Sequence, residues 1–214
     1  MKNRVLQSSL FVIVCIALGA GVGVYTSKYY QTSPTAKPEI PGLMWPNPKT
    51  LMPFSMVTQD NALFGLDQLQ GKWSFLFFGF THCPDICPVT LTVMKDVYAK
   101  LQALNAAADV QMIFVSVDPG RDTPEQLKEY AGFFHPDFIG LTGTDEQIAG
   151  LAGQIGVIHV IGEETAPGEY QVDHSASVFL VSPAGQLVAL FSAPQQTDEM
   201  LARYQSIRAF IEKQ

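Results

Sequence analysis

Two cysteines four positions apart are the residues of this chain best suited to chemistry. Cys83 and Cys87 lie in the segment 80–88, which reads Phe-Thr-His-Cys-Pro-Asp-Ile-Cys-Pro. At this spacing two thiols can form a disulfide, act as a redox couple or, if the residues between them curl into a single turn, bind one soft metal ion. A purely structural disulfide is the weakest of these interpretations, because it would close a very short loop and remove little unfolded-state entropy.

A metal site at this pair needs a ligand from elsewhere in the chain. Thiolates favour Cu(I) or Zn(II) over hard ions, and two thiolates alone leave a coordination position open. His174 lies in a polar segment, Val-Asp-His-Ser at 172–175, just before a predicted strand. We therefore predict that Cys83, Cys87 and His174 are the metal ligands. Asp173 is expected to accept a hydrogen bond from the imidazole, since metal-bound histidines usually have such a partner.

The other three histidines fit different roles. His82 adjoins Cys83, but neighbouring residues at the end of a strand point to opposite sides, which favours an orienting or exposed role. His135 precedes a proline at a predicted helix end and can interact with the helix dipole. His159 alternates with apolar residues, as an outward-facing strand position does.

Further carboxylates near the predicted site have two interpretations each. Asp85, between the cysteines, could influence the charge at the site or act as a helix cap. Asp118 and Asp122 follow a predicted strand end, where turn and cap chemistry is favoured over a role at the metal. We retain Asp85, Asp118 and Asp173 as candidates for residues that support the ligands.

The predicted secondary structure places the cysteine pair at the carboxyl edge of a sheet, where α/β folds carry their sites. Residues 73–80 form a continuous apolar and aromatic run, which predicts a buried central strand that ends just before Cys83. A helix is predicted beyond Cys87, with Pro88 at its first position. As the expected helix cap, Cys87 would gain thiolate stabilisation from free backbone N–H groups and the helix dipole.

The elements expected after residue 51 describe an α/β sandwich. They are a short hairpin, buried strands, two helices that begin at threonine caps, an antiparallel hairpin and a final helix capped by Thr197. The expected ranges are 54–57 with 62–65, 110–117, 123–134, 144–155, 175–181 with 186–191, and a helix from 197. This order is typical of a thioredoxin-like fold.

The first 28 residues predict a transmembrane anchor. Residues 5–25 contain no charged side chain, and such a run is about long enough to cross a bilayer as a helix. Lys2 and Arg4 precede the run, so the positive-inside tendency places the N-terminus in the cytoplasm and the remaining chain outside. A cleaved signal peptide is the alternative, because small residues within 19–23 could present a cleavage site. Cys15 is interpreted as a small membrane-buried residue.

The predicted organisation is an anchor at 1–28, a proline-rich linker at 29–50 and a thioredoxin-like metal-binding domain at 51–214. It corresponds to a single-pass protein of a bacterial-type inner membrane with its C-terminal domain in the periplasm. The formal net charge of −7 and the lack of a basic cluster argue against nucleic-acid binding. An acidic domain is better suited to a cationic metal or a basic partner.

Three motifs occur in order along the predicted domain. They are Phe-Gly-Phe-Thr-His-Cys-Pro-Asp-Ile-Cys-Pro-Val-Thr-Leu at 78–91, Val-Ser-Val-Asp-Pro-Gly-Arg-Asp-Thr-Pro at 115–124 and Val-Asp-His-Ser at 172–175. Together they resemble the Sco/SenC family of copper chaperones for cytochrome c oxidase assembly, over about residues 51–191.

The resemblance implies that Cys83, Cys87 and His174 bind Cu(I) or Cu(II). It further implies that oxidase subunit II is the partner, either receiving copper at its binuclear copper site or having the thiols of that site reduced. Other periplasmic copper chaperones or thiol reductases are further implied partners.

Three other functions are compatible with a cysteine pair on this fold. A thiol-disulfide oxidoreductase would use Cys83 and Cys87 as nucleophile and resolving thiol, although three residues rather than the usual two separate them. A peroxidase of peroxiredoxin type would use a low-pKa Cys83 without metal. A structural zinc site normally has four ligands, whereas three are identified here. A copper chaperone is therefore the favoured function, and thiol-disulfide exchange is its alternative or its companion activity.

Overall fold

A computed structural model describes residues 40–44, 47–166 and 168–213 of the chain. They belong to one structural unit, Ile40–Gln214. The anchor predicted at 1–28 and the first part of the predicted linker, 29–39, lie outside the described residues. Among the helices of the described ranges, none is both long and apolar enough to span a membrane.

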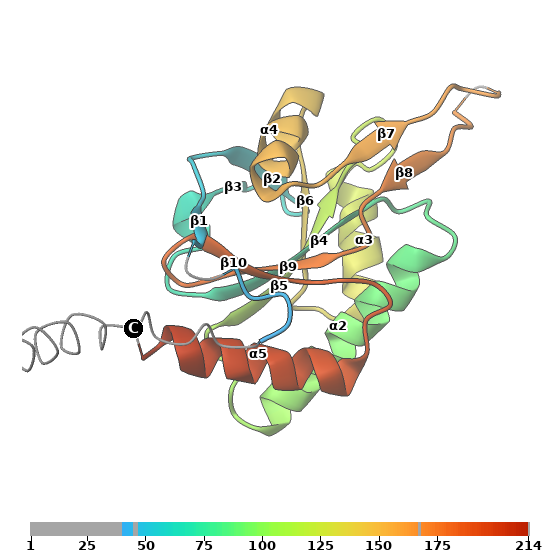
Figure 1. Ribbon diagram of the computed structural model, residues 1–214. Helices are drawn as coiled ribbons and strands as arrows, with labels where there is room; N and C mark the ends of the chain where they lie inside the picture. Colours follow the sequence, from blue (N-terminus) through green and yellow to red (C-terminus); the bar gives the residue numbers. More distant parts are fainter. Residues whose placement is uncertain (1–39, 45–46, 167, 214) are drawn as a thin grey trace, which may run out of the picture. The chain divides into compact units, whose positions relative to one another are not determined.

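A mixed sheet of eight strands forms the centre of the domain (Figure 1). Its order is β1-β10-β9-β4-β5-β6-β2-β3. The strands are β1 (Lys49–Thr50), β2 (Ser55–Thr58), β3 (Leu63–Gly65), β4 (Trp73–Gly79), β5 (Val110–Ser116), β6 (Ile139–Thr142), β9 (Val178–Val181) and β10 (Gln186–Phe191). Strands β4, β5 and β6 are parallel, and β9 pairs antiparallel with β4. Strand β4 is thus an interior strand of the sheet, between β9 and β5, and segments distant in sequence can converge at its carboxyl end.

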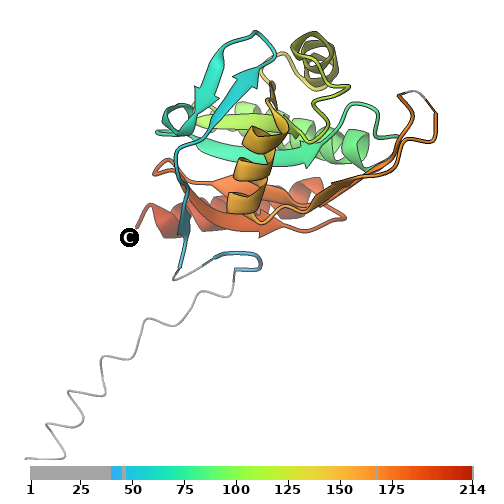
Figure 2. The ribbon, with the colours of Figure 1, turned by 90° about the horizontal axis from the view of Figure 1, so that it is seen from above.

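Helices cover both faces of this sheet (Figures 1 and 2). Helices α2 (Ile86–Ala103), α3 (Pro124–Phe134) and α5 (Thr197–Ile211) pack on one face and α4 (Asp145–Ile155) on the other, and a short 3-10 helix, η1 (Leu66–Gln68), follows β3. Along β4, Phe75 and Phe77 join the core with α2, α3 and α5, whereas Leu76 and Phe78 join the core with α4. Side chains of a strand alternate between faces, so a strand buried on both sides must be continuously apolar, as predicted for 73–80.

Most elements expected from the sequence are confirmed, and two helix starts are confirmed in detail. Thr123 and Thr144 cap α3 and α4, each accepting a hydrogen bond from the backbone of a glutamine three residues later. Each glutamine side chain in turn accepts from the threonine backbone, at 2.9 Å in both helices. Thr197, by contrast, is the first residue of α5, and Gln196 holds the cap position.

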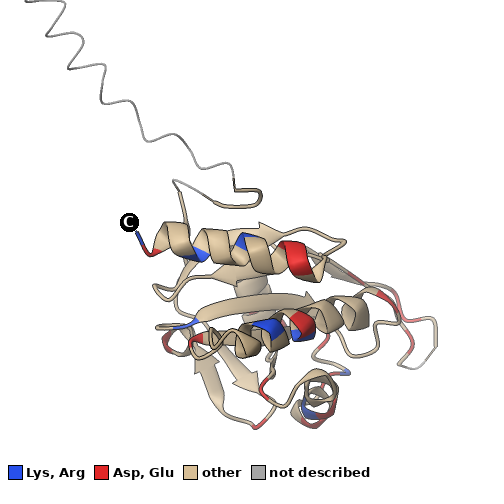
Figure 3. Ribbon diagram, turned by 90° about the horizontal axis from the view of Figure 1, so that it is seen from below, with Lys and Arg blue, Asp and Glu red and all other residues tan. Residues whose placement is uncertain are grey.

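Four strands lie outside the predicted strand ranges: β1 in the predicted linker, β6, and the pair β7 (His159–Ile161) and β8 (Val172–His174), which form a separate hairpin. Strand β6 completes the parallel part of the sheet. Strands β7 and β8 pair with each other in a second, two-stranded sheet that projects from the domain (Figure 1). The segment 157–175 contains four acidic residues and no lysine or arginine, and Figure 3 shows this acidic hairpin beside helices that carry both signs.

Part of the predicted linker lies against the domain. Strand β1 pairs antiparallel with β10, and the Met44 backbone N–H donates to the Val188 carbonyl at 2.7 Å. Arg203 of α5 donates to the Pro41 carbonyl at 3.1 Å. The domain therefore begins before the predicted boundary at residue 51, because a proline-rich segment can still pair with the edge of a sheet.

Candidate metal centre

The loop that carries the cysteines joins the end of β4 to the start of α2. Helix α2 begins at Ile86, with Asp85 at the cap position and without a side-chain cap hydrogen bond. Cys87 is fully buried in the first helical turn, and Cys83 is half-buried in the loop. The prediction that Cys87 caps this helix is wrong by two residues. Both thiols still lie near the helix N-terminus, where the dipole favours a thiolate.

Gly79, the last residue of β4, makes room for Cys87. A β-carbon at position 79 would lie 2.6 Å from Cys87 Sγ and 2.9 Å from Phe114 Cε2. Real β-carbons do not approach other atoms so closely, so the sulfur packs directly against the strand backbone only because residue 79 is glycine. The sequence showed this residue within a motif, but its packing role was not predicted.

The β7–β8 hairpin brings His174 to the two cysteines. His174 is the last residue of β8, rather than part of a loop as expected, and it pairs with His159 of β7. Its Nε2 lies 3.4 Å from Cys87 Sγ. The ligand atoms of Cys83, Cys87 and His174 all lie within 4.8 Å of one another. Metal–sulfur and metal–nitrogen bonds of about 2.0–2.3 Å would allow one ion to contact all three.

The imidazole of His174 is oriented for a metal by its second nitrogen. Nδ1 lies 3.2 Å from the Ser175 carbonyl oxygen. A carbonyl can only accept, so this contact places the ring proton on Nδ1 and leaves the Nε2 lone pair towards Cys87. Phe77 and Phe80 pack edge-on against the ring, with centroids 5.9 and 5.8 Å away. The ring is therefore held in an orientation suited to coordination through Nε2.

The two thiols differ in protonation. The hydrogen bond from the Cys87 side chain lowers the pKa of Cys83 well below that of an ordinary thiol, against the opposing effect of burial. The backbone N–H groups of Asp85 and Cys87 lower it further. The same thiol–thiol hydrogen bond, together with burial, raises the pKa of Cys87. Cys83 is thus the thiolate of the pair, and Cys87 keeps the shared proton.

The candidate supporting carboxylates lie in three different settings. Asp173 was predicted to accept a hydrogen bond from the His174 ring, but the Ser175 carbonyl accepts it instead. The Asp173 side chain is exposed, because neighbouring residues of a strand face opposite sides. Asp85 acts on Cys83 through its backbone N–H. Asp118 is fully buried and accepts hydrogen bonds from Arg121 and Tyr170 rather than from a ligand.

The other three histidines lie apart from the Cys83, Cys87 and His174 group. His82 is exposed, and its Nδ1 lies 3.0 Å from Thr81 Oγ1. His135 is the C-cap residue of α3. Neither residue, nor His159, belongs to the one group of side chains among the described residues that could hold a metal ion.

Asp122 organises the start of the cysteine loop. Its carboxylate is fully buried and accepts hydrogen bonds from the Thr81 hydroxyl and the Ser116 hydroxyl, both at 2.6 Å, and from the Thr81 backbone N–H at 3.1 Å. Burial raises the pKa of Asp122, although the bonds from Ser116 and Thr81 oppose this. The sequence favoured a turn or cap role, whereas the carboxylate joins the end of β5 to the residues before Cys83.

Comparison with known proteins gives the site a context. A model of the SCO1/SenC family matches residues 45–209. The chain belongs to the SCO1/SenC family. An SCO2-like protein of Rickettsia felis is 36% identical over 212 residues, which cover 94% of this chain and 98% of that protein.

Two solved structures extend the comparison with this SCO1/SenC protein. The structure of Arabidopsis thaliana ScoI with copper bound is 37% identical, with a TM-score of 0.68 over 75% of this chain and 98% of that one. The second is BsSco, described as containing a disulfide switch and as a member of the Sco family of cytochrome c oxidase assembly proteins. It is 30% identical, with a TM-score of 0.62 over 78% of this chain and 97% of that one.

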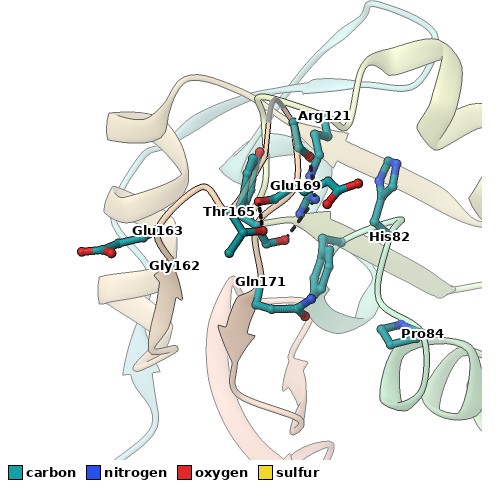
Figure 4. A pocket seen from close by; sticks show the side chains of 11 residues that line it. His82, Pro84, Arg121, Gly162, Glu163, Thr165, Glu169 and Gln171 are labelled. Carbon is teal, nitrogen blue, oxygen red and sulfur yellow. Dashed lines mark hydrogen bonds between the residues drawn. The ribbon is translucent and has the colours of Figure 1, made fainter.

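An open cavity of about 610 Å³ lies beside the cysteine loop of this SCO1/SenC protein (Figure 4). The cysteine loop, the loop after β5 and the β7–β8 hairpin form its walls. The lining residues are Phe80, His82, Pro84, Arg121, Gly162, Glu163, Thr165, Gly168, Glu169, Tyr170 and Gln171. His82 and Pro84 are the two neighbours of Cys83, so a partner segment entering the cavity would come close to the thiolate.

The unequal thiols predict a selective alkylation pattern in the reduced, metal-free SCO1/SenC protein. Between pH 8 and pH 6, the rate of Cys83 alkylation by iodoacetamide should fall by less than about threefold, because Cys83 stays a thiolate. An ordinary thiol would slow roughly a hundredfold over this range. Mass spectrometry would locate the label, and the urea-unfolded chain is the control. A hundredfold fall at Cys83 in the folded protein would contradict the assigned protonation.

The close contact at Gly79 predicts a destabilising effect of one methyl group. Gly79→Ala should lower the free energy of unfolding by about 1–3 kcal/mol, as overpacking does, and should weaken copper binding by displacing Cys87 Sγ. Urea unfolding and copper retention on a desalting column would measure both effects. Gly153→Ala is the control: this exposed glycine of α4 has no atom within 4 Å of an added β-carbon, and alanine there should stabilise by about 0.5–1 kcal/mol. Equal effects of the two variants would exclude a packing role for Gly79.

Proposed function

We propose that this SCO1/SenC protein is a copper metallochaperone. It binds Cu(I) or Cu(II) through Cys83, Cys87 and His174 and delivers it to the binuclear copper site of cytochrome c oxidase subunit II. The convergence of the three ligand atoms within 4.8 Å carries this proposal. The copper-bound structure of the Arabidopsis relative and the oxidase-assembly description of BsSco support it.

The chemistry of the ligand set suits a cargo metal. Two sulfurs and one imidazole nitrogen are donors that Cu(I) prefers, and Cu(II) also accepts imidazole. Binding requires Cys87 to lose the proton that it shares with Cys83, so copper uptake releases a proton. Three ligands leave room for a fourth from a partner, through which the metal can be exchanged.

Copper transfer tests this function directly. The reduced full chain is loaded with one equivalent of Cu(I) and mixed with the reduced, metal-free copper domain of subunit II, and copper is measured in the separated proteins. Most of the copper should move to the subunit II domain. The Cys83→Ala variant should neither retain nor transfer copper. Copper that stays on the loaded chain would contradict delivery to this partner.

Thiol-disulfide exchange is the second candidate, and the unequal thiols favour it. The Cys83 thiolate can attack a disulfide, and the buried Cys87 thiol can then resolve the mixed disulfide, so two electrons pass to the partner and a Cys83–Cys87 disulfide forms. The metal-free reduced protein mixed with the oxidised subunit II domain tests this reaction. Free thiols appearing on subunit II, without copper, would establish reduction as an activity of the protein.

We also propose that residues 1–28 anchor the protein in a bacterial-type inner membrane, with the domain in the periplasm. The long uncharged segment and the preceding basic residues support this location. After cell fractionation, the protein should resist carbonate extraction from membranes, and protease added outside the inner membrane should digest the domain. Recovery in the soluble periplasmic fraction would favour a cleaved signal peptide.

A further inference from the structure

The hairpin that carries His174 is not part of the central sheet. Among the described residues, β7 and β8 pair only with each other. Val160 and Ile161 are exposed along β7, whereas Val157, two residues before β7, and Val172, the first residue of β8, are buried. The two cysteines belong instead to the β4–α2 connection. The distance between imidazole and thiols therefore depends on contacts that hold the hairpin in place.

Arg121, in the loop after β5, makes several of these contacts. Its Nη1 donates to the Tyr170 carbonyl at 3.1 Å, and its guanidinium carbon lies 3.7 Å from the centre of the Tyr170 ring. The guanidinium carbon also lies 5.7 Å from the centre of Phe80, which packs against His174. Figure 4 shows the Arg121 side chain reaching the hairpin at one wall of the cavity. A cation that faces an aromatic ring and also donates to its backbone fixes that residue in both position and orientation.

Asp118 accepts hydrogen bonds from both Arg121 and Tyr170. One carboxylate oxygen accepts from Arg121 Nε at 2.6 Å, and the other accepts from the Tyr170 hydroxyl at 2.5 Å. The carboxylate is fully buried, so its two charge-assisted hydrogen bonds are not weakened by water. The Asp118 backbone N–H donates to Ser116 Oγ at 3.0 Å, which ties the group to the end of β5. The clamp thus runs from the central sheet to Tyr170, four residues before His174.

We propose that Arg121 is a positioning residue: with Asp118 it clamps Tyr170, and so holds the β7–β8 hairpin and His174 against the two thiols. The part of this inference that concerns the nitrogen ligand of the metal rests on the proposed copper function, whereas the part that concerns the position of the hairpin does not. Removing the clamp releases the imidazole while leaving the Cys83–Cys87 pair, which other elements hold, in place. The clamp therefore sets whether the metal receives its nitrogen ligand.

Two variants of the full chain test the clamp. Arg121→Ala removes the cation, and Tyr170→Ala removes the ring and hydroxyl while leaving the Arg121–Asp118 pair intact, so Asp118 does not become a lone buried charge. Arg208→Ala is the matched control, because Arg208 likewise pairs with an aspartate, Asp109 at 2.8 Å, and with a tyrosine hydroxyl, but on α5.

The first measurement needs no metal. The amides of Gly162 and Ser175 close the two ends of the hairpin through hydrogen bonds to Gln171 and Ile158. Both clamp variants should exchange these amides about tenfold faster than the wild type, with the β5 amides unchanged. Arg208→Ala should not alter the hairpin amides. Wild-type exchange in the hairpin of both clamp variants would overturn the proposal.

The second measurement separates a positioning role from general destabilisation. Each variant is loaded with one equivalent of Cu(II), and electron paramagnetic resonance is recorded for coupling to the imidazole nitrogen. Arg121→Ala and Tyr170→Ala should lose this coupling, whereas Arg208→Ala should retain it. Wild-type coupling in both clamp variants would contradict control of His174. A wild type that binds no copper would refute the proposed function, while the exchange data would still decide whether the clamp holds the hairpin.

Discussion

Replacing His174 with alanine is expected to lower the Cu(II) affinity of the reduced protein by more than about 100-fold while preserving the fold. Loss of a residue that merely orients a metal ligand already lowers metal affinity by about 10–100-fold. His174 supplies the one nitrogen donor of the three-residue group. The side chain lies on a hairpin outside the central sheet, so the free energy of unfolding should change by less than about 1 kcal/mol. Titration with Cu(II), followed by the thiolate-to-copper absorption band, measures the affinity, and urea unfolding measures the stability.

His159→Ala is the matched control for this experiment. His159 lies directly opposite His174 in the hairpin but does not belong to the group of candidate ligands. The His159→Ala variant should therefore bind Cu(II) as the wild type does. If His174→Ala retained the wild-type absorption, His174 would be removed from the ligand set and a different third ligand would be required.

Replacing Asp122 with alanine is expected to lower the free energy of unfolding by about 3–5 kcal/mol, because three donors lose their buried acceptor. These donors are the Thr81 backbone N–H and the hydroxyls of Thr81 and Ser116. Thr81 begins the cysteine loop, so copper retention should also fall. Urea unfolding of the metal-free protein measures the stability. A loss below about 1 kcal/mol would show that water replaces the carboxylate.

Asp122→Asn separates the acceptor role of this residue from its charge. The amide keeps one acceptor oxygen, so the variant should be more stable than Asp122→Ala. Burial raises the pKa of Asp122 in the folded state. The protonated carboxyl therefore adds to the free energy of unfolding at low pH, and this contribution is lost as the pH rises through the folded pKa. The stability deficit of Asp122→Asn relative to the wild type should therefore be smaller at pH 7 than at pH 4. A deficit that grows with pH would mean that the charged carboxylate is favoured in the fold.

The proposed copper binding and the proposed thiol exchange would both use the same unequal pair of sulfurs. Copper requires both thiols reduced and deprotonated, whereas exchange requires one thiolate and one protonated partner. The structure provides the second state when no metal is present, since Cys83 is the thiolate and Cys87 holds the proton. The two proposed activities would therefore alternate on one site, and copper occupancy should block exchange.

The sequence by itself determined the main elements of the fold and the candidate metal ligands. The continuous apolar run at 73–80 predicted a strand buried on both faces, observed as Trp73–Gly79, and the capping threonines fixed the starts of α3 and α4. The three candidate ligands could be proposed because Cys, Cys and His are chemically distinctive and occur in recognisable motifs, and the structure brings their ligand atoms together. These are local properties, which a linear sequence records directly.

Only the tertiary structure decided how the site is held together. The short strands of the hairpin have little local signal of their own, so the placement of His174 on β8 could not be derived. The buried bonds from Thr81 to Asp122 and from Tyr170 to Asp118 join segments far apart in the chain. The Ser175 acceptor and the space that Gly79 leaves for Cys87 involve residues near in sequence, but their geometry depends on how the surrounding elements pack. Residue type shows which atoms can bond, but distances set by packing decide which of them do. The sequence thus named the candidate ligands, and the three-dimensional packing of the loops around β4 and β5 decided their orientation and protonation.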